Sequence, residues 1–186
     1  MFAGVNHICV VTNDLDRAVR AWSDRYGVGP WSVYTKDASN MTARVDGVLA
    51  DFAMRVALAP LSATTRIELI QPLDDRSPYA QSLARRDGRD HLHHVRFDVD
   101  DYDAAHAYLH DHLGLHETLN AQFAGAPGVD GVFVGTYFDT EDDLGFVVEI
   151  GHATAGFAMP RPERVYQPSS TSPAASDAVS STASPP

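Results

Sequence analysis

The sequence predicts an α+β protein in which two tandem modules, each with the order β, α, β, β, β, build one cupped mixed sheet. Three observations predict this fold: an internal repeat with an offset of 87 positions, a strand-to-helix junction in each copy, and strand-like segments after each helix. Hydrophobic residues make up 44% of the 186-residue chain, which is enough for a domain core. We expect a single domain over 1–159, with one module at about 4–72, a linker at 73–90 and a second module at about 91–152.

The repeat begins at the first strand of each module. The segment "NHICVVTNDLDRAVRAWSDRYGV" from Asn6 aligns without gaps with "HHVRFDVDDYDAAHAYLHDHLGL" from His93. Six pairs are identical: His7 and His94, Asp14 and Asp101, Asp16 and Asp103, Ala18 and Ala105, Asp24 and Asp111, and Gly27 and Gly114. They fall where a strand, a helix start and a helix end are expected, so the same local fold is predicted twice.

Each copy carries the start and stop signals of a helix. Asp14 and Asp101 follow a β-rich run, and an aspartate there can accept hydrogen bonds from the free N–H groups of a first helical turn. Gly27 and Gly114 end the helices, because glycine tolerates the left-handed conformation of a C-cap. Apolar residues recur between them at helical spacing, namely Leu15, Ala18, Val19, Trp22 and Tyr26 in the first copy and Tyr102, Ala105, Leu109 and Leu113 in the second.

Strand-like segments follow each helix. In the first module they are "WSVYT", "ADFAMRVALAP" and "TTRIELIQP"; in the second they are "VFVGTYFD" and "GFVVEIGH", with "HETLNAQ" as a weaker candidate. The linker predicts a short helix near Pro78 to Arg86. The end of the chain, "QPSSTSPAASDAVSSTASPP", has little apolar surface to offset the entropy of ordering, so we expect a disordered tail over 160–186.

Composition excludes several classes of protein. A net charge of -11 with only 14 basic residues argues against a nucleic-acid partner, which requires clustered Lys and Arg. Cys9 is the only cysteine, so neither an internal disulfide nor a thiolate metal cluster is possible, and a cytoplasmic location is expected. Because the sequence has no secretory signal and no apolar run of about 18 residues, a membrane partner is not expected either.

Each module places one histidine in its first strand and one glutamate in its last. These are His7 with Glu68, and His94 with Glu149. Two imidazoles and two carboxylates suit Mn, Fe, Co, Ni or Zn better than Ca or Mg. A glutamate between apolar strand residues is costly to bury unless something compensates its charge. We therefore predict that the four side chains meet on the concave face of the sheet and bind one divalent metal ion.

The other histidines are not expected to bind the metal. Strand alternation places His91 and His93 on the opposite face from His94, where they would pack or form hydrogen bonds elsewhere. The histidines in the second predicted helix and just after it lack an evident carboxylate partner on another element. We interpret these as surface residues: His106, His110, His112 and His116.

The segments "NHICVVTNDLDRAVRAWSDRYGVGPW", "IELIQP", "HLHHVRFDVDD" and "GFVVEI" resemble the vicinal oxygen chelate superfamily, which includes glyoxalase I, methylmalonyl-CoA epimerase and extradiol dioxygenases. The resemblance covers about residues 4–152. It implies a paired βαβββ fold, one divalent metal ion and a homodimer, with His7, Glu68, His94 and Glu149 at the metal positions. The layout and the "GPW" motif are most similar to the methylmalonyl-CoA epimerase branch, whose additional catalytic carboxylate would correspond to Asp51.

This resemblance implies an isomerase or epimerase that removes a proton next to a carbonyl of a small-molecule substrate through a metal-stabilised enolate. Asp51 and Glu149 would be the two catalytic bases. Two positions limit the comparison with that branch. At the position of Glu68, epimerases of the branch often have Gln or Glu. At the position of Asp51 they usually have Glu, whose side chain is one methylene longer. No segment of the sequence indicates a coenzyme A pocket.

Three other functions remain open from the sequence. A glyoxalase I-type lyase uses the same order of ligands, His, Glu, His and Glu. An extradiol-type dioxygenase is less favoured, because it needs open metal positions that a fourth protein ligand would reduce. A metal-free binding protein could instead hold an apolar ligand against the aromatic residues Trp31, Tyr34, Phe52 and Phe133.

Overall fold

The computed structural model describes residues 1–168, whose strands form one mixed eleven-stranded sheet. The strands are β1 (Phe2–Val11), β2 (Trp31–Lys36), β3 (Met41–Val45), β4 (Val48–Ala50), β5 (Met54–Pro60), β6 (Arg66–Pro72), β7 (His91–Val99), β8 (Glu117–Ala124), β9 (Val132–Phe138), β10 (Val147–Ala153) and β11 (Arg164–Tyr166). The helices are α1 (Leu15–Tyr26), α2 (Pro78–Arg85), α3 (Tyr102–Ala107), the π-helical turn η1 (Tyr108–His112) and α4 (Glu141–Leu144).

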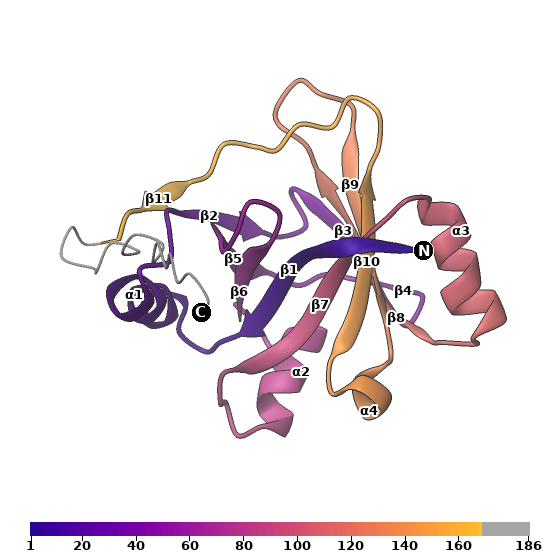
Figure 1. Ribbon diagram of the computed structural model, residues 1–186, viewed down its shortest axis with the longest axis horizontal. Helices are drawn as coiled ribbons and strands as arrows, with labels where there is room; N and C mark the ends of the chain where they lie inside the picture. The colour runs from indigo at the N-terminus through magenta and orange to yellow at the C-terminus, as the bar shows by residue number, and fades with distance from the viewer. Residues whose placement is uncertain (169–186) are drawn as a thin grey trace, which may run out of the picture.

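The sheet confirms the predicted pair of modules. Its strand order is β11-β2-β5-β6-β1-β7-β10-β9-β8-β3-β4. β1 pairs with β7 in antiparallel orientation at the seam between the modules, while β6 and β10 flank the seam in parallel orientation. Figure 1 shows the curled sheet with α1 and α3 on opposite outer sides. The two halves therefore share one concave face that extends across the seam.

The predicted helix signals operate in both copies. Asp14 accepts a hydrogen bond from the N–H of Arg17 at 2.9 Å, and Asp101 accepts one from the N–H of Ala104 at 3.0 Å. Gly27 closes α1 with a φ of 67°, a left-handed conformation that glycine adopts without strain. No helix within residues 1–168 is both long enough and apolar enough to cross a membrane.

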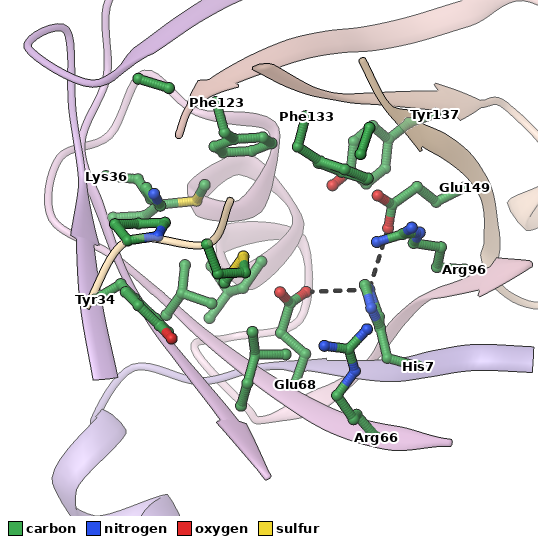
Figure 2. A pocket seen from close by; sticks show the side chains of 18 of the residues that line it. His7, Tyr34, Lys36, Arg66, Glu68, Arg96, Phe123, Phe133, Tyr137 and Glu149 are labelled. Atoms are coloured by element: carbon green, nitrogen blue, oxygen red, sulfur yellow. Dashed lines mark ion pairs between the residues drawn. The ribbon is translucent and has the colours of Figure 1, made fainter. Parts of the chain in front are cut away.

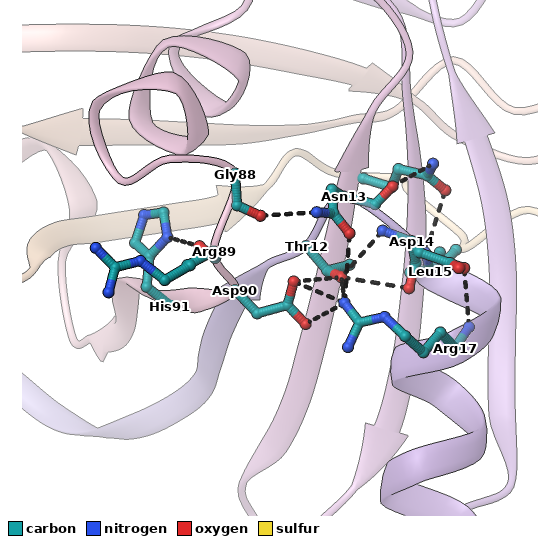
Figure 3. Close-up of polar contacts among 10 residues, drawn as sticks. Thr12, Asn13, Asp14, Leu15, Arg17, Gly88, Arg89, Asp90 and His91 are labelled. Atoms are coloured by element: carbon teal, nitrogen blue, oxygen red, sulfur yellow. Dashed lines mark hydrogen bonds and ion pairs between the residues drawn. The ribbon is translucent and has the colours of Figure 1, made fainter.

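The end of β1 is tied to the linker that leads into β7. Arg17 donates to both carboxylate oxygens of Asp90 at 2.9 and 2.8 Å, and Thr12 donates to the same carboxylate at 3.0 Å. Asn13 donates to the carbonyl of Gly88 at 2.7 Å, and Figure 3 shows these contacts side by side. They join the strand-to-helix junction of the first module to the entry strand of the second.

A hairpin that the sequence analysis did not predict interrupts the first module. The segment expected as one strand, "ADFAMRVALAP", is split, because β4 ends at Ala50 and β5 begins at Met54. β3 and β4 are joined by Asp46 and Gly47, both with positive φ, as a tight hairpin turn requires. β3 pairs with β8 of the second module, so the hairpin extends the far edge of the sheet.

The chain beyond β10 returns across the sheet to the first module. We call residues 154–163 the strap; they connect β10 to β11, and β11 pairs with β2 (Figure 1). Glu163 holds this end by accepting hydrogen bonds from the backbone N–H and hydroxyl of Thr35 at 2.8 and 3.0 Å. β11 lies beyond residue 159, where the predicted domain ends, and the boundary itself stays a prediction. The rest of the predicted tail, 169–186, lies outside the described residues.

Candidate metal centre

Four neighbouring strands carry the predicted ligands. Glu68 lies on β6, His7 on β1, His94 on β7 and Glu149 on β10, which is the order of these strands in the sheet. Cys9, two residues after His7 on β1, lies opposite both Glu68 and His94. The seam between the modules therefore brings all four predicted ligands to one place, and all four are buried.

The donor atoms are spaced as the ligands of one small cation would be. The Nε2 atoms of His7 and His94 lie 3.2 Å apart. Oε2 of Glu149 lies 3.1 Å from Nε2 of His7 and 3.2 Å from Nε2 of His94, and Oε2 of Glu68 lies at 3.4 and 3.2 Å from them. Around a cation with bonds of about 2.1 Å, adjacent ligand atoms lie about 3.0–3.4 Å apart.

One carboxylate oxygen at this centre is buried without a well-aligned hydrogen bond. Oε2 of Glu149 lies 3.1 Å from Nε2 of His7 and 3.2 Å from Nε2 of His94, but no donor of a described residue forms a hydrogen bond with it. A buried anionic oxygen is costly without compensation. A cation between the two imidazoles and the two carboxylates would compensate it, so the side chains present fit a divalent metal ion.

The charges at the centre depend on one another. Burial alone would raise the pKa of Glu149, but His7 and His94 outweigh it and hold the pKa well below its usual value. Glu68 behaves in the same way, with its pKa lowered by both histidines against the effect of burial. For His94, burial opposes the charge, yet Cys9 and the two carboxylates raise the pKa well above its usual value. Both glutamates are therefore ionised at neutral pH.

A β-bulge orients His94. Cys9 lies opposite His94 and Val10 lies opposite Leu92, so His93 is an extra residue on β7. Burial lowers the pKa of His93 well below its usual value, and the neutral ring lies with Nδ1 3.0 Å from Nδ1 of His94. That contact directs Nε2 of His94 toward the centre.

The bulge also corrects one expectation. His93 was predicted to lie on the face opposite His94, but it touches the His94 ring. His91 follows the prediction, with its two ring nitrogens 2.8 Å from the Ser82 hydroxyl and 2.8 Å from the Arg89 carbonyl oxygen.

Gly135 provides space for Glu149. It lies on β9, opposite Gly151 on β10, and a Cβ at Gly135 would lie only 2.9 Å from Oε1 of Glu149. Contacts shorter than 3.0 Å are not tolerated by real side chains without movement. The absence of a side chain at this position therefore allows the carboxylate to reach the centre.

The centre lies in the wall of a cavity of about 290 Å³. Tyr34 and Phe133 line it, whereas Trp31 and Phe52 belong to the buried core. Three basic side chains line the same cavity: Lys36, Arg66 and Arg96. In Figure 2, Lys36 and Tyr34 lie on one side of it, and His7, Arg96 and Glu149 lie on the other.

These three basic residues were not among the predicted site residues. Arg66 and Arg96 lie directly opposite His7 in the sheet register. Two signals were available. Arg96 has the same parity as His94 along β7, and Lys36 is the only lysine in the chain.

Asp51 is not brought to the centre. It follows β4, its side chain is exposed, and it is absent from the described residues that line the cavity. The unpredicted β3–β4 hairpin explains this, because it pairs with β8 and places Asp51 beside the outer edge of the sheet. The catalytic role of Asp51 remains a prediction that the geometry does not support.

The histidines that were interpreted as surface residues lie on α3 and η1 or just after them. His106 was expected to have no partner on another element, but its Nε2 lies 2.9 Å from a carboxylate oxygen of Glu117 on β8. His116 lies 2.8 Å from Asp46. Among residues 1–168, the groups with metal-ligand spacing are His7 with His94 and Glu149, and Cys9 with Glu68 and His94.

The sequence matches the profile of the Glyoxalase/Bleomycin resistance protein/Dioxygenase superfamily over residues 6–133. The chain belongs to this family, which is the vicinal oxygen chelate superfamily that the motifs resembled. No curated protein matches the sequence significantly.

Solved structures with a similar fold include methylmalonyl-CoA epimerases. The enzyme from Mycobacterium tuberculosis is 21% identical, with 81% of this chain and 87% of that chain covered and a TM-score of 0.55. A methylmalonyl-CoA epimerase in complex with methylmalonyl-CoA and NH4+ is 19% identical, with 85% and 99% covered and a TM-score of 0.57. A hypothetical protein from Bacillus halodurans C-125 is 15% identical, with 86% and 95% covered and a TM-score of 0.56. At these identities the likeness establishes the fold.

Proposed function

We propose that the protein is a divalent-metal-dependent isomerase or epimerase that moves a proton on the carbon next to a carbonyl. The observation that carries this proposal is the convergence of two histidines and two glutamates, of which His7, Glu68 and Glu149 line a cavity sized for a small molecule. Similarity to methylmalonyl-CoA epimerases supports this choice within the superfamily.

The four side chains would hold one cation, and their mixed nitrogen and oxygen donors suit Co, Mn, Ni, Zn or Fe. When bound, such an ion supplies Lewis acidity toward an oxygen of the substrate. Arg96 lines the same side of the cavity and adds a positive charge there. A carbonyl or carboxylate oxygen would be drawn to this side.

The two glutamates are the bases within reach of the cavity. Both are held ionised by the imidazoles, and both line the cavity. We propose that Glu149 removes the proton and that Glu68, on the other side of His7 in Figure 2, returns it. Asp51 would take the second role only if the segment after β4 moved toward the cavity.

A glyoxalase I-type reaction is the second candidate, because the observed set of two histidines and two glutamates also fits that group. An extradiol-type dioxygenase is less favoured, since two carboxylates at the centre leave fewer open positions. In a metal-free binding protein, the two imidazoles alone would compensate the buried Oε2 of Glu149. Glutathione dependence would distinguish the glyoxalase reaction from the epimerase reaction.

Metal analysis and deuterium exchange test the proposal. Protein purified without added metal should retain about one divalent ion per chain, and solvent deuterium should enter the carbon next to the carbonyl of a substrate. Glu149→Gln should reduce exchange by about 10²-fold or more. Asp51→Asn is the comparison variant, and it should leave deuterium exchange unchanged. An equal loss of exchange in this variant would assign to Asp51 the role proposed for Glu68. A chain that neither retains nor binds a divalent ion would contradict the proposal.

We also propose that the protein forms a homodimer. Only the family resemblance supports this part of the proposal. Light scattering coupled to size-exclusion chromatography measures it. A mass near 40 kDa would be expected, twice the 20.2 kDa of one chain.

A further inference from the structure

Lys36 is a buried cation that makes no direct ion pair with any of residues 1–168. It ends β2, is 9% exposed and lines the cavity. Within residues 1–168 its side chain forms neither a hydrogen bond nor an ion pair; its Nζ instead lies 5.7 Å from the ring centre of Tyr34 and 5.6 Å from that of Phe123. Glu163 acts on it electrostatically, but the oxygens of that carboxylate are bonded to Thr35.

The chemistry of Lys36 makes an unpaired state costly. Burial disfavours its charge and lowers its pKa, and the two aromatic faces offset only part of that cost. Every other basic side chain of the protein is an arginine. An anionic group of a ligand inside the cavity would supply the missing partner for the one lysine.

Arg96 provides a second cation at the opposite end. It lies opposite His7 and Glu149 in the sheet register, and its guanidinium lies 4.2 Å from the ring centre of Phe133. Within residues 1–168, its Nε is buried without a hydrogen-bond partner and its guanidinium forms no ion pair. Apolar side chains line the space between these two cations: Met54, Val56, Leu58, Ile70, Phe123 and Phe133.

We propose that the substrate is a small dicarboxylic acid, with one end at the metal centre beside Arg96 and a second carboxylate, carried on a short apolar chain, bound by Lys36. This inference rests on the proposed function for the metal end. A carboxylate fits Lys36 better than a phosphate does, because the single ammonium at this end matches one negative charge, whereas a phosphate monoester carries about −1.5 to −2.

The strap limits the size of the ligand. Phe157, Met159 and Pro160 line the cavity. The strap is held by hydrogen bonds in its middle and at its end, where the Ala126 N–H donates to the carbonyl of Ala158 and the Glu163 N–H donates to the carbonyl of Val33. A volume of about 290 Å³ lies at the lower limit of ligand pockets, which range over about 300–1,000 Å³. The free acid therefore fits this site better than a bulky thioester does.

Matched acids test the proposal on the full-length, metal-loaded chain. Calorimetric titration would compare 2-oxoglutarate with 2-oxopentanoate, and 2-oxoadipate with 2-oxohexanoate, since each pair differs only in the distal carboxylate. In at least one pair the diacid should bind roughly tenfold tighter or better. Lys36→Met should abolish that preference and Lys36→Arg should retain part of it. Arg89→Met, which removes one exposed positive charge outside the cavity, should leave it unchanged.

A second measurement does not depend on the variants folding. Reductive methylation with ¹³C-formaldehyde labels only the N-terminus and Lys36, and the Lys36 signal should shift when the diacid is added to the wild-type protein. Equal affinities within both pairs, or a Lys36 signal unmoved by a bound diacid, would overturn the inference. Tighter binding of the coenzyme A thioester of the same diacid would also overturn it. Metal content, measured separately, tests the proposed function, so the two can fail independently.

Discussion

At the residue scale, His94 couples the metal centre to pH. Its pKa in the metal-free chain lies well above the usual histidine value: burial opposes its charge, but Cys9 and the carboxylates of Glu149 and Glu68 outweigh that effect. Below that raised pKa, His94 holds a proton that must leave before Nε2 can bind a cation. Metal affinity should therefore rise with pH up to the raised pKa and level off above it.

Calorimetry in two buffers of different ionisation enthalpy checks this expectation. Near neutral pH the apparent binding enthalpy for Co²⁺ or Zn²⁺ should differ between the buffers, because the proton released by His94 is taken up by the buffer. Identical enthalpies in both buffers would mean that His94 is already neutral in the metal-free protein.

Gly135 gives a sharper test of how Glu149 is positioned. Gly135→Ala would place a methyl group about 2.9 Å from Oε1 of Glu149 and displace the carboxylate. Metal affinity should fall by about 10–100-fold, the usual effect of disturbing a group that orients a ligand. Gly4→Ala is the matched control, because a Cβ there meets no atom within 4 Å. Equal metal affinity in both variants would contradict the role assigned to Gly135.

Cys9 should be unreactive although its sulfur lies beside the ligands. Its side chain is fully buried, and burial raises the pKa of its thiol to about 12. Because the thiolate is the reactive species, iodoacetamide at about pH 8 should leave Cys9 unmodified in the native protein and alkylate it after unfolding. Mass spectrometry counts the added groups, and rapid alkylation of the native chain would show that this part of the sheet opens.

At the element scale, the strap and β11 join the two modules across the cavity. Glu163 secures them through its two hydrogen bonds to Thr35. Glu163→Ala should lower the Tm by about 2–4 °C and increase hydrogen exchange over 154–166, while the central strands keep their protection. Exchange that rises equally in β1 and β7 would instead indicate global destabilisation.

Elements differ in how well local sequence predicts them. The capped helix α1 follows from Asp14, its apolar spacing and Gly27, which all lie within a few residues of one another. The β3–β4 hairpin has a local turn signal, Asp46 and Gly47, but its place in the sheet depends on pairing with β8. The Arg164–Tyr166 strand depends in the same way on β2. Such distant pairings leave little trace in local periodicity.

At the scale of the whole molecule, duplication creates the site. Each module alone supplies one histidine and one glutamate, and only the β1–β7 seam brings the two pairs within 3.1–3.4 Å. The protein carries a net charge of -11, yet three basic residues line this one cavity. Glu68 and Glu149 line the cavity as well, so the three basic residues would favour an anionic ligand once a cation offsets these two carboxylates.

By itself, the sequence determined the two-module fold, the starts of the helices that follow β1 and β7, and the residue types proposed as ligands. These features depend on alternation along a strand, capping at a helix end and repetition, all of which are local or periodic. Only the tertiary structure decided that Asp51 lies outside the cavity, that His93 touches His94, and that Lys36 and Arg96 line opposite sides of one cavity. Those relations arise from strand pairings between distant segments and from one inserted residue at a bulge, which change the direction of a side chain without changing the pattern around it.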